Sequence, residues 1–265
     1  MENLIREIDW VAAKEQFTTA TPFNHVVIDN FFLPEVAEKI SNEFPDYNDP
    51  ELGQYNSPLE HKKVCNHWDR FPKTTYQAFT FLGRTEFVSR IRYLVGDETL
   101  NLDFGLNGGG WHMHTKDGVV NIHLDYNVHP KLREQRKVNI IIYLTPNWDQ
   151  SWGGGLELWT HDPETRRPKE KVKTVDVIYN RAVIFDTTQN SWHGLPTRLT
   201  CAEGVYRNSL AAYYVRPAPE GTDPRGKVLY APNEDQKGNA EIEELILKRA
   251  NVDTASQSYR PEEKK

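Results

Sequence analysis

Three side chains in the middle of the 265-residue chain have types and a spacing that suit a metal ion. His123 and Asp125 lie two positions apart, and His193 follows much later in the chain. On a β-strand, positions i and i+2 point to the same face, so His123 and Asp125 can present an imidazole and a carboxylate to one ion. A second imidazole from a distant strand completes two histidines and one carboxylate, the ligand set of non-haem Fe(II) sites that keep positions open for oxygen chemistry.

The pair by itself does not settle the interpretation. A His-x-Asp pair is common by chance, and the chain holds nine histidines. His112 and His114 form an equally compact pair with the same alternation. The segments that follow His123 and Asp125 therefore have to distinguish the two pairs.

The downstream segments supply a strand that carries a hydroxyl, a glycine-rich turn that opens a strand, and a histidine after a polar turn. These are Val138–Leu144 with Tyr143, Gly153–Gly155, and His193 with Gly194. Further on, Arg207 and Ser209 share one face of a predicted strand. A guanidinium beside a hydroxyl suits a terminal carboxylate, because the planar fork donates two parallel hydrogen bonds.

With these motifs in this order, the chain resembles the Fe(II)- and 2-oxoglutarate-dependent dioxygenases, and within them the prolyl-4-hydroxylase-like branch. The resemblance spans about residues 22–216. It is carried by His123–Tyr126, Arg136–Trp148, Gly153–Trp159, His193 with Gly194, and Arg207, and the N-terminal segment Pro22–Leu33 is also similar.

The resemblance implies a role for each motif residue. The Fe(II) ligands would be His123, Asp125 and His193, and Arg207 would pair with the distal carboxylate of 2-oxoglutarate, assisted by Ser209 and Tyr143. O2 would be consumed with 2-oxoglutarate, and the family also allows ascorbate as an auxiliary reductant. Many animal prolyl hydroxylases hold 2-oxoglutarate with a lysine. Here no lysine follows His193 until Lys227, so Arg207 would take that role.

The implied reaction is hydroxylation of an unactivated C–H bond with release of succinate and CO2. Chlorinating relatives need a vacant position for halide where the carboxylate would sit, so Asp125 favours hydroxylation. The favoured substrate is a prolyl or other residue of a peptide or protein. One alternative is a free small molecule, such as an amino acid or a biosynthetic intermediate. Another is a non-catalytic β-barrel that binds a ligand or a metal ion.

The fold expected around this site is mainly β with flanking helices. The resemblance implies a double-stranded β-helix, a jelly-roll or cupin-like barrel braced by N-terminal helices. Short β runs with turn clusters between residues 100 and 215 independently indicate a sandwich or barrel. We expect one oxygenase domain over 1–217, with helical support over about 1–98 and the barrel over about 99–217. A C-terminal extension over 218–265 would hold one helix near 239–250 and a frayed tail from Thr254.

The N-terminal part is predicted to contain a strand near 25–29 and helices over about 34–44, 73–82 and 84–95. Two polar stretches, Pro45–Phe71 and Thr160–Lys173, are predicted as surface loops that could cover the barrel mouth. Residues beside the metal motifs are candidates for the substrate pocket: Trp111, His112, His114, Asn121, Tyr126 and Trp192, with Trp68, Asp69 and Arg70 on the first loop.

Composition narrows the classes of partner. The chain has 32 Lys and Arg against 38 Asp and Glu, a net charge of −6, so no nucleic-acid partner is expected. No apolar run approaches the roughly 20 residues that span a membrane, and no secretory signal precedes the first strand. The two cysteines, Cys65 and Cys201, are far apart and in no metal-binding pattern. A cytoplasmic protein is therefore expected, with an oligomeric state that the sequence leaves open.

Overall fold

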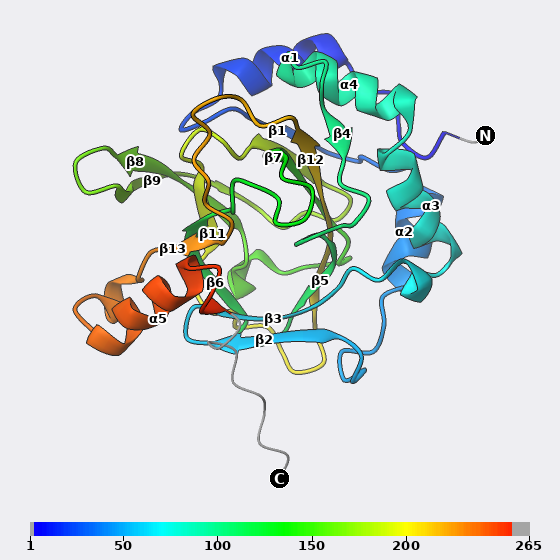
Figure 1. Ribbon diagram of the computed structural model, residues 1–265. Helices are drawn as coiled ribbons and strands as arrows, with labels where there is room; N and C mark the ends of the chain where they lie inside the picture. The colour runs from blue at the N-terminus through cyan, green and yellow to red at the C-terminus, as the bar shows by residue number, and fades with distance from the viewer. Residues whose placement is uncertain (1–2, 256–265) are drawn as a thin grey trace.

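A curved antiparallel sheet forms a nearly closed barrel, with helices packed on one side of it (Figure 1). The computed structural model describes residues 3–255. Its 13-stranded sheet runs in the order β1-β10-β7-β12-β5-β3-β6-β11-β8-β9, with β13 paired to β6, β2 to β3 and β4 to β12. The strands are β1 (His25–Ile28), β2 (Gly53–Ser57), β3 (Glu60–Cys65), β4 (Asn101–Leu102), β5 (Gly110–His114), β6 (Val119–Leu124), β7 (Gln135–Tyr143), β8 (Leu156–Asp162), β9 (Arg167–Val175), β10 (Ala182–Asp186), β11 (Trp192–Leu195), β12 (Arg207–Arg216) and β13 (Leu229–Tyr230).

The helices begin and end where the local sequence supplies caps. Asp9 accepts hydrogen bonds from the first turn of one helix, Pro34 starts the next, and Gly96 ends another in the left-handed conformation that glycine adopts without strain. The α-helices are α1 (Trp10–Thr19), α2 (Pro34–Asn42), α3 (Lys73–Leu82), α4 (Thr85–Val95) and α5 (Ala240–Ala250), and short 3-10 turns cover Trp68–Arg70, Gln150–Trp152 and Glu234–Gln236.

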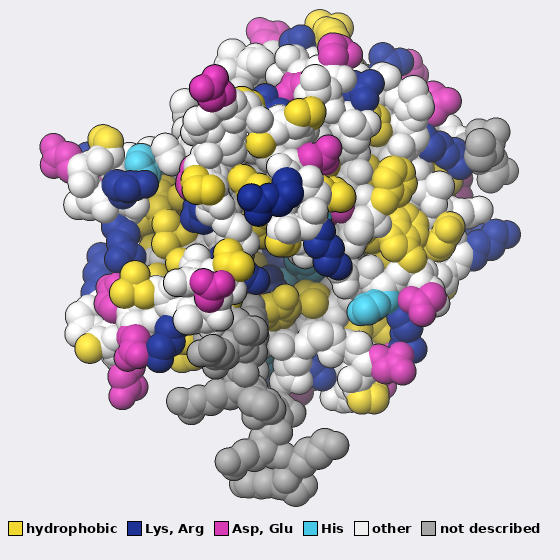
Figure 2. All heavy atoms as spheres, in the orientation of Figure 1, with side chains coloured by type: hydrophobic (Ala, Val, Ile, Leu, Met, Phe, Trp, Pro, Cys, Tyr) yellow, Lys and Arg dark blue, Asp and Glu magenta, His cyan; other side chains and the backbone are white. Residues whose placement is uncertain are grey.

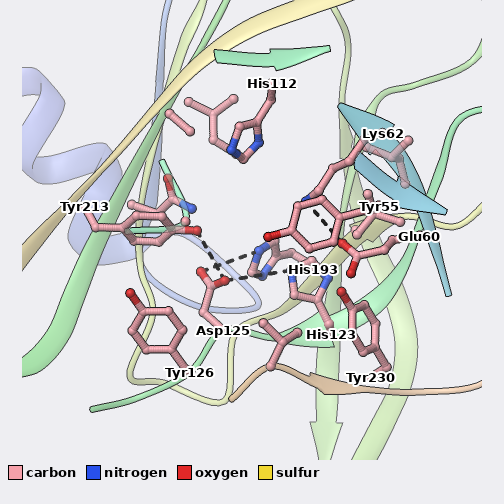
Figure 3. A pocket seen from close by; sticks show the side chains of 18 of the residues that line it. Tyr55, Glu60, Lys62, His112, His123, Asp125, Tyr126, His193, Tyr213 and Tyr230 are labelled. Carbon is pink, nitrogen blue, oxygen red and sulfur yellow. Dashed lines mark hydrogen bonds and ion pairs between the residues drawn. The ribbon is translucent and has the colours of Figure 1, made fainter. Parts of the chain in front are cut away.

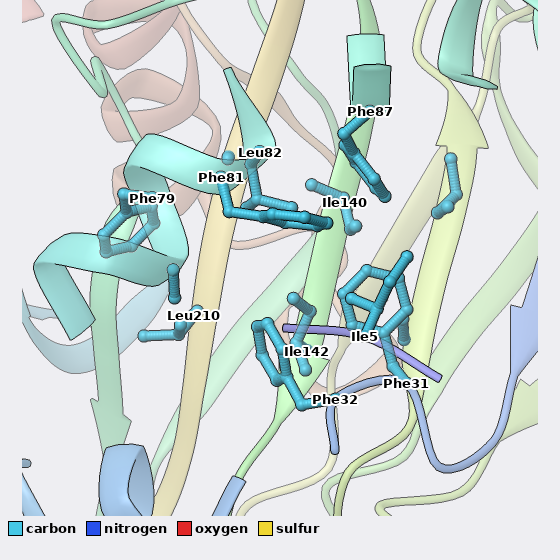
Figure 4. Packing of buried hydrophobic residues seen from close by; sticks show 14 of the residues in the cluster. Ile5, Phe31, Phe32, Phe79, Phe81, Leu82, Phe87, Ile140, Ile142 and Leu210 are labelled. Carbon is cyan, nitrogen blue, oxygen red and sulfur yellow. The ribbon is translucent and has the colours of Figure 1, made fainter. Parts of the chain in front are cut away.

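The main hydrophobic core lies between the N-terminal helices and the sheet. Figure 4 shows Phe79, Phe81 and Phe87 of α3 and α4 against Ile140 and Ile142 of β7. These five side chains are all less than a tenth exposed. Burying each aromatic or aliphatic side chain is worth about 1.5–3 kcal/mol, so this layer stabilises the sheet from its outer side. The polar residues described below lie on the other side of the sheet, inside the barrel.

The predicted double-stranded β-helix is confirmed, and so are the strand near residue 25 and the helices over 34–42, 73–82, 85–95 and 240–250. Two predicted loops are wrong. Pro45–Phe71 contains the hairpin β2–β3, and β3 is inserted between β5 and β6. Thr160–Lys173 belongs to the hairpin β8–β9, which projects from the barrel (Figure 1); most of β9 is exposed on both faces, whereas Leu156 and Leu158 of β8 are buried. Helix α1 and strand β5 were not predicted.

The segment after β12 folds back onto the barrel. Strand β13 pairs with β6, so that Tyr230 lies opposite His123, and α5 packs beside it. The division of the chain near residue 217 stays a prediction, and most of the predicted tail, residues 256–265, lies outside the described residues. Within residues 3–255, none of the helices has the length and apolar character that a membrane crossing requires.

Candidate metal centre

Two imidazoles and a carboxylate converge inside the barrel. His123 on β6 and His193 on β11 are direct cross-strand partners, and their ring centroids are 4.3 Å apart. Asp125 follows β6, and its two carboxylate oxygens lie 3.9 Å from the Nε2 atoms of His123 and His193 respectively. The three possible ligand atoms lie within 4.8 Å of one another, and this is the one group of this kind found among the described residues (Figure 3).

Glycine 194 makes this pairing possible. A Cβ atom at Gly194 would lie 2.7 Å from the backbone oxygen of Asn121 and 2.8 Å from that of Val120 on β6. Real Cβ contacts are never that short, so any larger residue would push β11 away from β6. The sequence His193-Gly194 thus combines a ligand with the residue that lets its strand approach the other ligands.

Each imidazole is oriented by a backbone carbonyl two residues upstream. His123 Nδ1 lies 2.9 Å from the Asn121 oxygen, and His193 Nδ1 lies 2.7 Å from the Ser191 oxygen. A carbonyl only accepts, so both Nδ1 atoms carry a proton, and in the neutral form of each ring Nε2 keeps its lone pair toward Asp125. This is the tautomer that a metal ligand needs.

The charge state of the group also suits a cation. Burial and the neighbouring His193 lower the pKa of His123 to about 3, so this imidazole is neutral at physiological pH. Burial by itself would raise the pKa of Asp125, but the Arg136 guanidinium and the hydrogen bond from Tyr213 favour the carboxylate, and the net pKa is lowered. Asp125 Oδ2 is buried and has no hydrogen-bond partner among the described residues. The arrangement therefore offers a carboxylate oxygen and two imidazole lone pairs to one ion, and it fits Fe(II).

A buried cation lies on the other side of the barrel interior. Arg207 on β12 is 3% exposed, and its Nε donates to the Gly154 oxygen at 2.8 Å. That bond fixes the guanidinium and leaves its two terminal nitrogens to other acceptors. Gly154 has a φ of +84°, and a Cβ atom there would lie 2.9 Å from Arg207 Cδ, so the glycine-rich turn is shaped to receive this arginine.

Hydroxyl groups flank Arg207 as the sequence predicted. Ser209 is two residues further along β12, on the same face, and it pairs with Tyr143 of β7. The Arg207 guanidinium carbon lies 4.8 Å from the centre of the Tyr143 ring. Burial raises the pKa of Tyr143, so its hydroxyl stays protonated beside the Arg207 guanidinium. A guanidinium, a serine and a phenol can together bind a carboxylate.

The competing histidine pair lies beside this cation rather than in the metal group. On β5, His114 pairs with Arg207 and His112 pairs with Ser209. Neither ring nitrogen of His114 has a hydrogen-bond partner among the described residues. Burial lowers the pKa of His112 to about 3 and takes the pKa of His114 well below its usual value, so both rings line the cavity as neutral groups.

Three of the six predicted pocket residues, His112, His114 and Tyr126, do line the cavity, and Trp111, Asn121 and Trp192 do not. Trp111 points the other way from its neighbour on β5 and packs on Phe44 and Phe71. Asn121 donates to the Ala231 oxygen. The loop residues Trp68, Asp69 and Arg70 do not line the cavity either, and Arg70 is paired with Asp49 and Glu51.

Sequence reasoning missed an arginine next to Asp125. The guanidinium carbon of Arg136 lies 3.4 Å from the ring centres of both Tyr126 and Tyr213, and its Nη1 lies 3.7 Å from Asp125 Oδ1. Tyr213 donates to the same oxygen at 3.3 Å. Tyr213 could have been found, because it continues the alternation of Arg207 and Ser209 along β12. Arg136 could not, because a bulge shifts the register of β7 against β12 between it and Val138.

The cavity opens past the metal group toward charged residues of β3 and the C-terminal segment. Glu60, Lys62 and Tyr230 line this part (Figure 3), and so does Arg249. In the space-filling view, dark blue Lys and Arg side chains lie around a central hollow in which histidine is visible (Figure 2). None of these four residues was singled out from the sequence, because they come from segments that were predicted as a loop and a separate extension.

Comparisons with known proteins agree with a site for Fe(II) and 2-oxoglutarate. Residues 110–215 match the model of the 2OG-Fe(II) oxygenase superfamily, and this span contains every predicted metal and co-substrate residue. The prolyl 3-hydroxylase OGFOD1 of Mus musculus is 26% identical over 204 residues, which are 74% of this chain and 33% of that protein. The chain thus spans about a third of the length of that relative.

Two solved structures share the fold at low sequence identity. A prolyl-4-hydroxylase from Pseudomonas putida has a TM-score of 0.55 and 14% identity, with 79% of this chain and 100% of that chain covered. A prolyl hydroxylase from Trichoplax adhaerens, in complex with a hypoxia inducible factor peptide fragment, has a TM-score of 0.55 and 15% identity, with 79% and 94% covered.

The fold and the matched segment define an oxygenase barrel of the prolyl-4-hydroxylase-like kind. Over residues 110–215 the chain matches the 2OG-Fe(II) oxygenase superfamily, and its metal group and buried arginine fit Fe(II) and 2-oxoglutarate, the two cofactors of that superfamily.

Proposed function

We propose that this protein hydroxylates a prolyl residue of a peptide or protein, using Fe(II), 2-oxoglutarate and O2. The observation that carries the proposal is the convergence of His123, Asp125 and His193 in one cavity with the buried Arg207. Bound together, Fe(II) and 2-oxoglutarate supply the oxidation of an unactivated C–H bond, coupled to the loss of CO2 and the formation of succinate.

The residues of the chain bind and orient these partners. His123, Asp125 and His193 would hold the metal, with both Nδ1 protons fixed by backbone carbonyls. Arg207 would hold the distal carboxylate of 2-oxoglutarate, with the Ser209 and Tyr143 hydroxyls as further donors. Because Arg207 is buried, its charge is little screened by water, and a dianion gains more from it than at the surface.

The choice of a prolyl substrate is supported by the relatives. The mouse protein that matches over 74% of this chain is a prolyl 3-hydroxylase. Beyond the metal group the cavity continues between β3 and the C-terminal segment, which gives a substrate side chain a path to the metal. A free small molecule remains the alternative substrate, and the same assay distinguishes the two.

The test is 2-oxoglutarate turnover with Fe(II) over pools of proline-containing peptides and of free amino acids. We expect succinate release and a mass gain of one oxygen atom on a prolyl residue. His123→Ala should abolish both, whereas His67→Ala, which changes an exposed histidine, should leave them unchanged. Oxygen transfer to free amino acids alone would replace the peptide assignment, and no 2-oxoglutarate consumption with any pool would contradict the proposal.

A further inference from the structure

A lysine points into the cavity from β3, which is separated from the strand of Arg207 by β5 alone. Lys62 lies on β3 two residues after Glu60, so both face the barrel interior. Its side chain is 16% exposed and lines the same cavity as His123 and Asp125. In Figure 3 it extends from β3 toward Tyr55 and the histidines.

The carboxylate next to Lys62 already has a closer partner. Glu60 is 3% exposed, and its Oε1 is in close contact with Arg249 of α5, which is itself 4% exposed. Lys62 Nζ lies 3.4 Å from the other oxygen of Glu60. A charge-assisted hydrogen bond measures about 2.7–2.9 Å, so Lys62 forms only a loose ion pair there. The single negative charge of Glu60 lies between the positive charges of Lys62 and Arg249, so the three side chains together carry one uncompensated positive charge.

The other charged residues that line the cavity do not compensate this positive charge either. The lining holds the cations Lys62, Arg136, Arg207, Lys227 and Arg249 and the anions Glu60 and Asp125. Arg136 lies beside Asp125, Arg249 beside Glu60, and Arg207 is fixed beside the hydroxyls that suit 2-oxoglutarate. The ammonium of Lys62 is thus an excess cation in a partly buried position, where pairing with an anion is worth more than at the surface.

We propose that Lys62 binds a carboxylate of the primary substrate, so that the enzyme prefers an Asp or Glu side chain close to the residue it hydroxylates. This inference rests on the proposed function and narrows its substrate class to acidic peptide segments. The ammonium of Lys62 has three donors; it forms a loose ion pair with Glu60 and lies 5.3 Å from the ring centre of Tyr55. A carboxylate entering from the cavity mouth can therefore bind it without displacing Arg249 from Glu60.

Lys63 provides a matched control. It is the next residue on the same strand, so its side chain leaves the opposite face, and its Nζ lies 4.8 Å from the ring centre of Tyr47. Lys62→Gln and Lys63→Gln therefore remove the same charge from the same strand, but only the first removes it from the cavity. Lys62→Arg keeps the charge and should retain the preference in part.

The first experiment compares hydroxylation of peptide pairs that differ by Glu against Gln at each position within three residues of the proline. For wild type and Lys63→Gln we expect kcat/KM to be about tenfold higher with Glu at one or two positions. For Lys62→Gln this ratio should fall to about one, while the KM for 2-oxoglutarate stays unchanged. Equal turnover of Glu and Gln peptides by wild type would overturn the inference and leave the proposed function intact. A raised KM for 2-oxoglutarate with an unchanged Glu preference would also overturn it, because Lys62 would then serve the co-substrate.

A binding measurement keeps the inference testable if no peptide is hydroxylated. The full-length protein, loaded with Mn(II) and 2-oxoglutarate, is titrated with N-acetylglutamate amide and with N-acetylglutamine amide. We expect the glutamate compound to bind at least about tenfold more tightly to wild type and to Lys63→Gln, and this difference to vanish in Lys62→Gln. Equal binding of both compounds to wild type would contradict the role of Lys62 whatever the activity of the enzyme.

Discussion

Arg207 is a buried guanidinium with one of its nitrogens fixed by the Gly154 carbonyl. If its terminal nitrogens pair with the distal carboxylate of 2-oxoglutarate, Arg207→Ala loses hydrogen bonds between charged groups, each worth about 1.5–3 kcal/mol. We expect the KM for 2-oxoglutarate to rise about 10- to 100-fold, measured by succinate release. Arg198→Ala, which changes an exposed arginine, should have no such effect. An unchanged KM in Arg207→Ala would place the co-substrate elsewhere.

His112 makes the stability of the metal-free protein depend on pH. Burial, and next the charge of Lys62, lower its pKa in the folded protein to about 3, below the 6.5 of an unfolded chain. Below pH 6.5 the unfolded state therefore takes up a proton that the folded state does not, and the free energy of unfolding falls. For one group this loss is at most about 1.4 kcal/mol per pH unit, and it ends near pH 3.

His112→Asn removes this contribution. In urea unfolding of the metal-free protein from pH 7 to pH 4, we expect wild type to lose stability more steeply than the variant. The difference between the two should arise below about pH 6.5. Parallel curves would mean that His112 is not held neutral by its surroundings.

At the scale of the element, the pair β6–β11 determines where the ligands meet. Gly194→Ala would place a methyl group 2.7–2.8 Å from two carbonyl oxygens of β6, so the strands must separate. We expect Mn(II) affinity to fall at least about tenfold, together with a loss of stability of about 1–3 kcal/mol, as for other overpacked sites.

Gly204→Ala is the control for that change. Its φ of +81° makes alanine strained there, but a Cβ atom would contact nothing within 4 Å. It should lose about 1–2 kcal/mol of stability and keep full Mn(II) affinity. A Gly194→Ala variant with unchanged metal affinity would show that the approach of β11 to β6 does not position the ligands.

The alternation of residues along strands made most of the site predictable. It placed His123 beside Asp125 and Arg207 beside Ser209, and it would also have placed Tyr213. It failed where a strand has no buried face to mark it, as along most of β9, and where a bulge changes the phase, as at Arg136. Pairings between segments far apart in the chain, such as Glu60 with Arg249, leave no local pattern and needed the structure.

At the scale of the whole molecule, the ion pair between Glu60 of β3 and Arg249 of α5 attaches the C-terminal helix to the barrel. Removing one partner of a buried ion pair costs about 3–5 kcal/mol when the other charge is left alone. Lys62 stays near Glu60 in Arg249→Met, so we expect a smaller loss of about 1–3 kcal/mol in urea unfolding. The double variant Glu60→Gln/Arg249→Met should recover part of it. If Arg249→Met were as stable as wild type, the ion pair would contribute nothing to holding the extension.

The polar hairpin β8–β9 has a consequence for how separate molecules behave in concentrated solution. Among the described strands β9 pairs only with β8, so it ends the sheet and presents backbone groups to solvent. Lys169, Lys171 and Lys173 alternate along β9 with Glu170 and Val172, and all five side chains are exposed. Lysines along such an edge repel a second copy that would otherwise add its own strand, and Pro168 removes one donor from the row. The hairpin can thus extend far from the barrel without becoming a template for aggregation.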